Sequence, residues 1–240
     1  MRIALQGTGD AGGTPRYGCE CAACRNIRRG PTHATVQTDG MQIMLDAGST
    51  FPLQPPQAVL LTHFHIDHVQ GLFPLRWGKG DPVHVFAPDD PERMKVLFGT
   101  PGVLEFHHPV EPFDLGSLTV TPIPLQHSVP TLGWLLEDNE GCLAYLVDTK
   151  GLPDASLDLL RATPIDLLVL DATSPPGSDD PNHNDLDEAF EIVRDLKPHR
   201  TLLVHVSHDL DTWKLGRSFD MPAGVEFVSD GHALAVVQGK

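Results

Sequence analysis

The chain has 240 residues, of which 40% are hydrophobic, so it can bury a sizeable core and is not expected to be disordered. Its 17 basic and 32 acidic residues give a net charge of −15, which disfavours a protein that grips a nucleic-acid backbone. No apolar run approaches the roughly 18 residues of a membrane span. We therefore expect a soluble cytoplasmic protein whose partner is a small molecule, not a nucleic acid or a membrane.

Short β-like runs separated by turn residues recur along the chain. We expect strands over Ile3–Leu5, Met41–Asp46, Ala58–Thr62, Val83–Ala87, Leu118–Pro122, Gly133–Glu137, Cys142–Asp148, Leu167–Asp171, Leu202–Val206, Val225–Val228 and Ala233–Val237. Helical patterns are fewer: one begins near Asp67, and others span Asp154–Arg161 and Asp185–Leu196, the last with Glu188 placed for a capping box. Because strands outnumber helices, the pattern predicts stacked sheets with outer helices, in one domain over residues 1–240.

A cluster of metal-binding residue types follows the apolar run Ala58–Leu61. It contains His63, His65, Asp67 and His68, four potential ligands within six residues. Imidazole and carboxylate ligands together suit Zn, Mn, Fe or Co. Two ions could be served, one by the first two histidines and one by the last two residues. A chance cluster among 13 histidines is the alternative, but its place directly after a strand argues against chance.

Further potential ligands stand at the ends of other predicted strands. His127 follows the run that begins at Leu118, Asp148 ends the run from Cys142, and His205 lies near the end of the run from Leu202. Each alone is more often structural. Together with the first motif they provide seven ligands for two ions, and Asp148 is suited to bridge them.

In residue type and order, these seven residues resemble the metal-binding pattern of the metallo-β-lactamase superfamily. The resemblance implies an α+β four-layer αββα sandwich with a binuclear metal site at one edge. It also implies how the ligands are shared: one ion would be bound by His63, His65 and His127, and the other by Asp67, His68 and His205, with Asp148 between them. Asp67 is also expected to take part in catalysis.

A second cluster, in a loop at about residues 18–24, has the spacing C-x-C-x-x-C. Three thiolates from Cys19, Cys21 and Cys24 can wrap a tetrahedral zinc ion and leave one position for a distant ligand. His208 is the expected fourth ligand. It lies three residues after His205, so one turn of the chain could contribute to both metal sites. Cys142 is its rival, although strand alternation suits that thiol to the core. A redox cluster or merely buried thiols are the alternatives to structural zinc.

Three other segments narrow the resemblance to one branch, the phosphonate-pathway cyclic phosphodiesterases of the PhnP family. They are the Cys-rich loop, the segment Val69–Gly78 after the metal motif, and Asn182–Leu186 at the start of a helix; a glycine-rich loop at Gly7–Gly13 adds to the likeness. The resemblance implies hydrolysis of 5-phospho-α-D-ribosyl 1,2-cyclic phosphate to ribose 1,5-bisphosphate in the carbon–phosphorus lyase pathway. Activity supported by Mn and a homodimer are further implications. The expected active-site metal is Mn or Zn, with Fe, Co or Ni as other possible ions.

The chemistry suits these residues. Two divalent ions would hold a hydroxide that attacks phosphorus, and His183 would protonate the leaving sugar oxygen. The alternative for His183 is a capping or exposed histidine. Arg76, Lys79 and the backbone amides of the Gly7–Gly13 loop could bind a second substrate phosphate, although solvated surface charges are an equal alternative for the two side chains. Asp46 would orient a ligating histidine. The other six histidines, which include His84 and His107, are interpreted as structural or exposed.

Competing functions remain open at the level of the sequence. A tRNA 3′-processing ribonuclease shares the ligand pattern, but the net charge of −15 and the lack of an obvious basic insertion argue against it. A lactonase or thioesterase explains neither the cysteine cluster nor His183. A non-catalytic carrier, like the PQQ-biosynthesis relatives, would not need all seven ligands.

Overall fold

The computed structural model describes residues 1–49, 51–52 and 56–239. Within these ranges the strands form two seven-stranded sheets. The first has the order β14 (Ala233–Ala235), β1 (Arg2–Gly7), β2 (His33–Thr38), β3 (Met41–Leu45), β4 (Ala58–Leu60), β5 (Val83–Phe86), β6 (Leu104–His107). The second has the order β13 (Val225–Phe227), β12 (Arg200–Val204), β11 (Leu167–Asp171), β10 (Cys142–Leu146), β9 (Leu132–Glu137), β8 (Leu118–Pro124), β7 (Phe113–Leu115).

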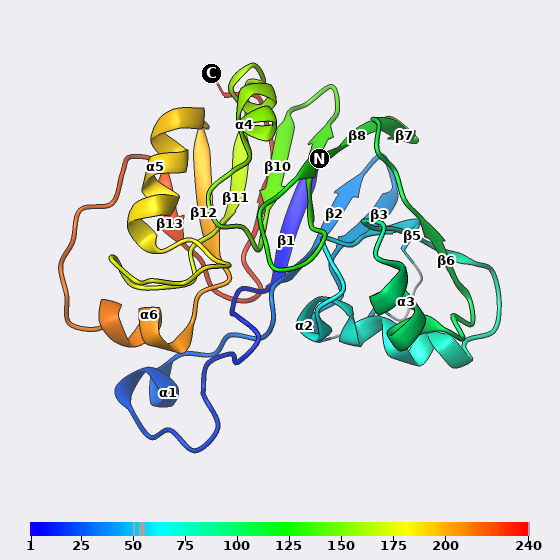
Figure 1. Ribbon diagram of the computed structural model, residues 1–240. Coiled ribbons are helices and arrows are strands. Elements are labelled where there is room, and N and C mark those ends of the chain that lie inside the picture. Colours follow the sequence, from blue (N-terminus) through cyan, green and yellow to red (C-terminus); the bar gives the residue numbers. More distant parts are fainter. Residues whose placement is uncertain (50, 53–55, 240) are drawn as a thin grey trace.

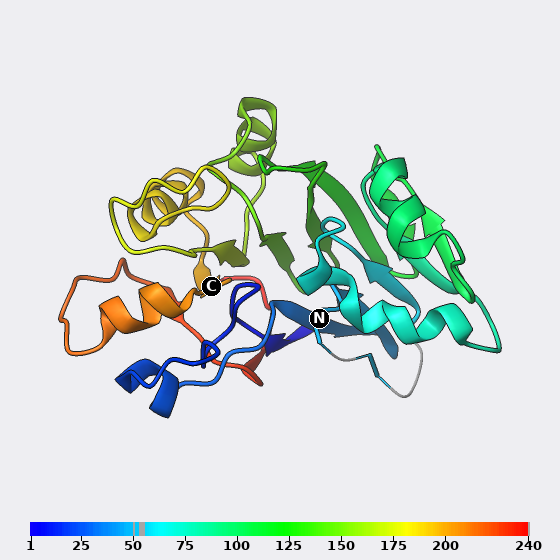
Figure 2. The same cartoon turned by 60° about the horizontal axis from the view of Figure 1, so that its bottom comes forward.

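Helices cover the outer faces of both sheets (Figures 1 and 2). The second sheet packs against α4 (Asp154–Arg161), α5 (Leu186–Leu196) and α6 (His208–Lys214), and the first against α2 (Ile66–Val69), the 3₁₀ helix η1 (Gln70–Trp77) and α3 (Pro91–Phe98). A third apolar cluster, which includes the buried Trp134 and Tyr145, fills the space between the sheets. The predicted four-layer αββα sandwich is therefore confirmed. No helix in the described ranges is both long and apolar enough to cross a bilayer.

Most of the predicted elements form. Helix α4 has the predicted bounds, and α5 begins after Asp185, whose side chain makes the predicted capping box with Glu188. The sequence interpretation missed β2, β6 and β7 and the helices α1 (Ala22–Asn26), α3 and α6. Helix α3 had a readable signal, because Asp90 caps it directly before Pro91. The short β6 and β7 depend on pairing with neighbouring strands, which a local pattern does not reveal.

Several strands end earlier than predicted, and the early ends matter for the site. Asp46, Asp148 and His205 follow β3, β10 and β12 and adopt the left-handed conformation, with φ of 59°, 61° and 58°. Only five described non-glycine residues have positive φ, and three of them are these predicted site residues. Such backbone is unfavourable for residues with a Cβ and is concentrated at functional sites. The turns therefore aim three polar side chains out of the carboxyl ends of buried strands.

Candidate metal centre

The seven predicted ligands come together at one edge of the two sheets. Their side chains form two adjoining groups in which the potential ligand atoms lie within 4.8 Å of one another: His63, His65, His127 and Asp148 in one, and Asp67, His68 and His205 in the other. The first sheet supplies the residues that follow β4, and the second supplies those that follow β8, β10 and β12. The edge where the carboxyl ends of strands from both sheets meet thus holds every residue of the predicted set.

Asp148 lies between the two groups. Its Oδ2 atom is 3.5 Å from Nε2 of His63 and 3.4 Å from Nε2 of His68, while its Oδ1 atom is 3.2 Å from Nε2 of His205. His127 Nε2 is 3.7 Å from the same Oδ2 atom. One carboxylate therefore faces ligands of both groups, the position that a bridging ligand needs.

Buried atoms at the centre of this cluster lack hydrogen-bond partners. They are Nε2 of His63, His68 and His205 and Oδ1 of Asp148. A buried polar atom without a partner costs about 1–3 kcal/mol, so four such atoms facing one another require an explanation. Divalent metal ions would satisfy them, and the nitrogen and oxygen donors are those that Zn, Mn, Fe and Co accept. The residues present therefore fit a metal centre.

The remaining ring nitrogens of four histidines are bound elsewhere. Nδ1 of His68 donates to Oδ2 of Asp46 at 2.9 Å, and Nδ1 of His127 donates to the Asn182 carbonyl at 3.1 Å. Nδ1 of His63 and of His205 contact the hydroxyls of Thr62 and Thr173, at 3.0 and 2.8 Å. Each hydroxyl donates its own proton to a carboxylate and so accepts from the ring. A neutral ring whose Nδ1 is bound in this way presents the Nε2 lone pair toward the centre. Burial opposes the charged ring, but Asp148 and Asp46 raise the pKa of His68 well above its usual range and Asp148 raises the pKa of His205, so metal binding would displace a proton from these two rings.

Asp46 organises one side of the cluster from a fully buried position. Besides His68, it accepts from the Thr62 backbone N–H at 2.7 Å, from the Thr62 hydroxyl and from the Tyr145 hydroxyl at 3.3 Å. Burial, together with the nearby Asp46 and Asp148 charges, raises the pKa of Tyr145 well above its usual range, so this hydroxyl stays a donor. These contacts give Asp46 the orienting position expected from the sequence.

The carboxylates of the cluster remain ionised. Burial alone would raise the pKa of Asp67, but the neighbouring His205 and His68 rings hold it below its usual range. Burial likewise opposes the charge of Asp148, and the surrounding His205, His68 and His63 hold its pKa well below the usual range. Burial lowers the pKa of His63 well below that of a free imidazole. Anionic carboxylates and a neutral His63 are the protonation states that bind metal.

His183 lies beside the cluster and is tied to a buried carboxylate. Its Nδ1 atom is 3.0 Å from Oδ2 of Asp171, and its ring stacks on His205 with centroids 4.8 Å apart. Burial disfavours the charged ring, but Asp171 outweighs burial and raises the pKa of His183 to about 9. With 17% of its side chain exposed, the ring reaches solvent at the edge of the cluster. Without bound metal, His183 is therefore a cationic ring at neutral pH beside the candidate metal centre.

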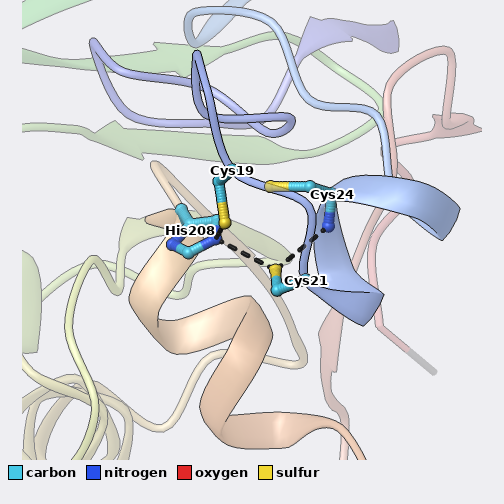
Figure 3. Close-up of side chains that lie close together, drawn as sticks. All are labelled: Cys19, Cys21, Cys24 and His208. Atoms are coloured by element: carbon cyan, nitrogen blue, oxygen red, sulfur yellow. Dashed lines mark hydrogen bonds between the residues drawn. The ribbon is translucent and has the colours of Figure 1, made fainter.

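The cysteine cluster forms a separate group with His208 (Figure 3). Nε2 of His208 is 3.5 Å from Sγ of Cys19 and 3.2 Å from Sγ of Cys21, and Cys24 completes the group within 4.8 Å. The Cys24 backbone N–H, with help from His208, lowers the pKa of Cys21 to about 6, so its thiolate is available at neutral pH. Cys142 instead packs in the apolar cluster under α4 and α5.

A sequence profile described as the β-lactamase superfamily domain matches residues 43–206, more than half of the chain. The chain belongs to the metallo-β-lactamase superfamily. Among solved structures of this superfamily, a diphosphatase described as new and from the PhnP family has a TM-score of 0.83, 30% sequence identity and coverage of 99% of both chains. Short-form human tRNase Z has a TM-score of 0.72 at 18% identity over 98% of this chain and 99% of its own, which shows a shared fold alone.

Curated relatives within the superfamily have diverse names. An octanoyltransferase of Porphyromonas gingivalis is 30% identical over an alignment of 237 positions that covers 87% of this chain and 46% of the relative. The chain thus spans about half the length of that protein. Coenzyme PQQ synthesis protein B of Pseudomonas paraeruginosa is 27% identical over an alignment of 226 positions that covers 72% of this chain and 73% of its own. Membership of the superfamily therefore does not specify the substrate.

The residues predicted to contact the substrate lie in two parts of the molecule, at η1 and in the Gly7–Gly13 loop. Arg76, in η1, donates to the Thr100 carbonyl at 3.1 Å and lies over the Trp77 ring, while Lys79 is exposed beyond the end of η1. The Gly7–Gly13 loop does lie against the His205 turn, because the Val206 backbone N–H donates to the Thr8 carbonyl at 3.0 Å. Binding of a second phosphate by Arg76 or Lys79 stays a prediction.

The sequence interpretation missed one polar residue that holds the site together. Asp171 accepts from His183, from the Thr173 hydroxyl at 2.7 Å and from the Thr149 backbone N–H at 3.0 Å. It also lies within 4.8 Å of potential ligand atoms of Asp148, His183 and His205. A signal was available, because Asp171 ends the apolar run from Leu167 as Asp148 ends its own. The rule that found Asp148 would have found Asp171.

Proposed function

We propose that this protein is a metal-dependent phosphodiesterase that opens 5-phospho-α-D-ribosyl 1,2-cyclic phosphate to ribose 1,5-bisphosphate during the use of phosphonates. The observation that carries the proposal is the position of His183, a proton donor fixed by Asp171 at the edge of the candidate metal centre. Ring opening of a cyclic phosphate expels an alkoxide, which needs a proton from such a group. The likeness to a PhnP-family structure at 30% identity supports hydrolysis at phosphorus.

The ligand cluster would hold two divalent ions, for which Mn or Zn are the expected metals. Such ions lower the pKa of a coordinated water and neutralise charge on phosphoryl oxygens. They would also make the site locally positive, so that an anionic substrate can bind to a protein with a net charge of −15. The contribution of the chain is to fix the rings, since Asp46, Thr62 and Thr173 hold their orientation and leave Nε2 free.

His183 would deliver its proton from Nε2. Nδ1 of this ring is occupied by Asp171, which leaves the opposite nitrogen as the available donor. The T-shaped contact with His127, at a centroid distance of 5.0 Å, and the stacking on His205 restrict the ring to one orientation between the two ligand groups. A leaving oxygen of the substrate at this place would be protonated as it departs.

A second candidate reaction, cleavage of a diphosphate, is favoured by one specific observation. The PhnP-family structure with 30% identity is described as a diphosphatase. Diphosphate cleavage uses the same metal chemistry but expels a phosphate, which is a weaker base than a sugar alkoxide and depends less on an acid. The two reactions therefore differ in how much they need His183.

The test is metal add-back after chelation, with four substrates in parallel. The chelated protein is supplied with Mn²⁺, Zn²⁺, Co²⁺ or Ni²⁺ and assayed on the ribosyl cyclic phosphate, bis-p-nitrophenyl phosphate, a sugar or nucleoside diphosphate, and a precursor tRNA. Metal-dependent opening of the cyclic phosphate with intact tRNA is the expected result. Preference for the diphosphate would favour the second candidate, tRNA cleavage would assign the protein to RNA processing, and no turnover of any substrate would favour a non-catalytic carrier.

A further inference from the structure

We infer that His84, Glu105 and His107 form a separate surface site for a first-row divalent ion such as Zn²⁺. These residues lie on β5 and β6 of the first sheet, and their potential ligand atoms are within 4.8 Å of one another. None of them belongs to the candidate metal centre or to the cysteine cluster. Two imidazoles and one carboxylate are a ligand set that zinc accepts, and such three-ligand sites keep open positions for water.

The register of the strands places the three side chains together. In the parallel pair of β5 and β6, His84 lies opposite Glu105 and Phe86 lies opposite His107. Because side chains alternate along a strand, all four residues share one face of the sheet. Backbone pairing therefore fixes the relative positions of these side chains. A chance meeting of long surface side chains would not be constrained in this way.

The distances are those of ligands around a small ion. Nδ1 of His84 is 3.0 Å from Nε2 of His107, and the Glu105 oxygens are 3.9 and 3.8 Å from those two atoms. Bonds of about 2.0–2.1 Å in a tetrahedral site separate ligand atoms by about 3.3 Å. The two nitrogens are close to this spacing, and the Glu105 carboxylate lies slightly beyond it.

Stacked aromatic rings hold the imidazole of His107 in place. His107 stacks on Phe86 with centroids 4.9 Å apart, and Phe86 stacks on Phe113 of the second sheet at 4.5 Å. Both phenylalanines pack against the core between the sheets. The His107 ring is thus held in place, while the side chains of His84, Glu105 and His107 remain 47%, 53% and 35% exposed. An ion could enter from solvent and keep water in its open positions.

The ion would join the last two strands of the first sheet. β6 ends the order of the described strands and pairs with β5 alone. A ligand that binds only the folded state stabilises it, so Zn²⁺ at this site would raise the melting temperature. The competing interpretation is a hydrogen bond between His84 and His107 without any ion.

The experiment compares bound zinc in the wild-type protein and in the double variant His84→Gln/His107→Gln after equilibrium dialysis at the same free Zn²⁺. The candidate metal centre and the cysteine cluster are the same in both proteins, so the difference in zinc content isolates the surface site. We expect one ion fewer per chain in the double variant and at least about tenfold weaker binding in Glu105→Gln. His199→Gln, which removes an exposed histidine elsewhere, should match the wild type.

Two further sets of measurements show whether the double variant folds normally and whether Zn²⁺ binding stabilises the protein. Circular dichroism and turnover of the phosphodiester should be unchanged in the double variant, because these residues lie outside the candidate active site. Added Zn²⁺ should raise the melting temperature of the wild type more than that of the double variant. Equal zinc content and equal melting shifts in the two proteins would overturn the proposal and leave a hydrogen-bonded histidine pair.

Discussion

His183 and Asp171 are joined across the edge of the second sheet by a 3.0 Å contact between Nδ1 and a buried carboxylate oxygen. Asp171 is fully buried and His183 is mostly buried, so their attraction is weakly screened by solvent. The carboxylate fixes the orientation of the ring, its charge state and the nitrogen that faces outward. One pair therefore determines three properties that a proton donor needs.

Replacement of His183 by alanine is expected to lower kcat on the ribosyl cyclic phosphate by about 10²–10⁴-fold, the usual contribution of a positioned acid. Metal content should stay close to that of the wild type because the seven candidate ligands remain, whereas the melting temperature should fall because Asp171 loses its charged partner. The measurement is steady-state kinetics together with elemental analysis.

The leaving group provides the control for this variant. p-Nitrophenolate departs without a proton, so hydrolysis of bis-p-nitrophenyl phosphate should fall much less than ring opening. An equal loss on both substrates would contradict a role as acid and would indicate that His183 supports the metal centre instead.

The rate should decrease at alkaline pH as His183 loses its proton. Asp171 raises the pKa of His183 to about 9 against the opposing effect of burial, and the acid acts only when protonated, so activity is lost as pH rises through that pKa. Bound divalent cations would lower the pKa of the ring, because they repel its positive charge. The fall of activity at alkaline pH (the alkaline limb of the pH profile) is therefore expected at or below pH 9. The pH dependence of kcat measures it.

Asp171→Asn tests the origin of that limb. Without the carboxylate, the pKa of His183 should fall, and the alkaline limb should move to lower pH. An alkaline limb that stays in place in this variant would assign it to another group, such as the water that attacks phosphorus.

Asp46→Asn is expected to weaken metal binding by about 10–100-fold, because His68 loses the carboxylate that orients its ring. The free energy of unfolding should fall by about 1–3 kcal/mol, since buried donors lose a charged acceptor. Asparagine tolerates the φ of 59° at this position, so the variant tests the charge and not the backbone. Chelator competition and denaturant unfolding measure the two effects.

Asp39→Asn is the matched control. Asp39 also has positive φ, at 45°, but it lies in an exposed turn between β2 and β3. Its replacement should leave metal affinity unchanged and alter stability by no more than about 0.5 kcal/mol. Similar losses in both variants would show that the contacts of Asp46 are not the cause of the effect.

Sequence reasoning identified the residues that meet in the candidate metal centre because they obey a simple rule: polar residues at the ends of apolar strands meet at one sheet edge. The rule placed Asp148 and His205 beside the His63 motif, and it applies equally to Asp171. It could not show that Thr62 and Thr173 relay hydrogen bonds from ring nitrogens to carboxylates, because those contacts depend on rotamers and on left-handed turns. The local pattern was also too weak for β6 and β7, whose existence depends on pairing with distant segments.

Cys21→Ser is expected to reduce the zinc content associated with the cysteine cluster, whereas Cys142→Ser should leave it unchanged, because Cys142 lies in the apolar core. The serine hydroxyl can still cap α1, where Cys21 accepts from the Cys24 backbone N–H, so the helix itself should persist. Elemental analysis of the two variants measures the difference. Equal zinc content in both would contradict a metal site at the thiols.

Acid should release the same ion from the wild-type protein. The Cys24 backbone N–H is the main cause that lowers the pKa of Cys21 to about 6, and protons compete with metal for the thiolate below that value. A bound ion lowers the effective value further, so release should begin at or below pH 6 as the pH falls. Zinc release is followed with a chromogenic chelator.

Because His208 starts α6 only three residues after His205, loss of this ion should also loosen the turn that carries His205 and reduce activity in parallel.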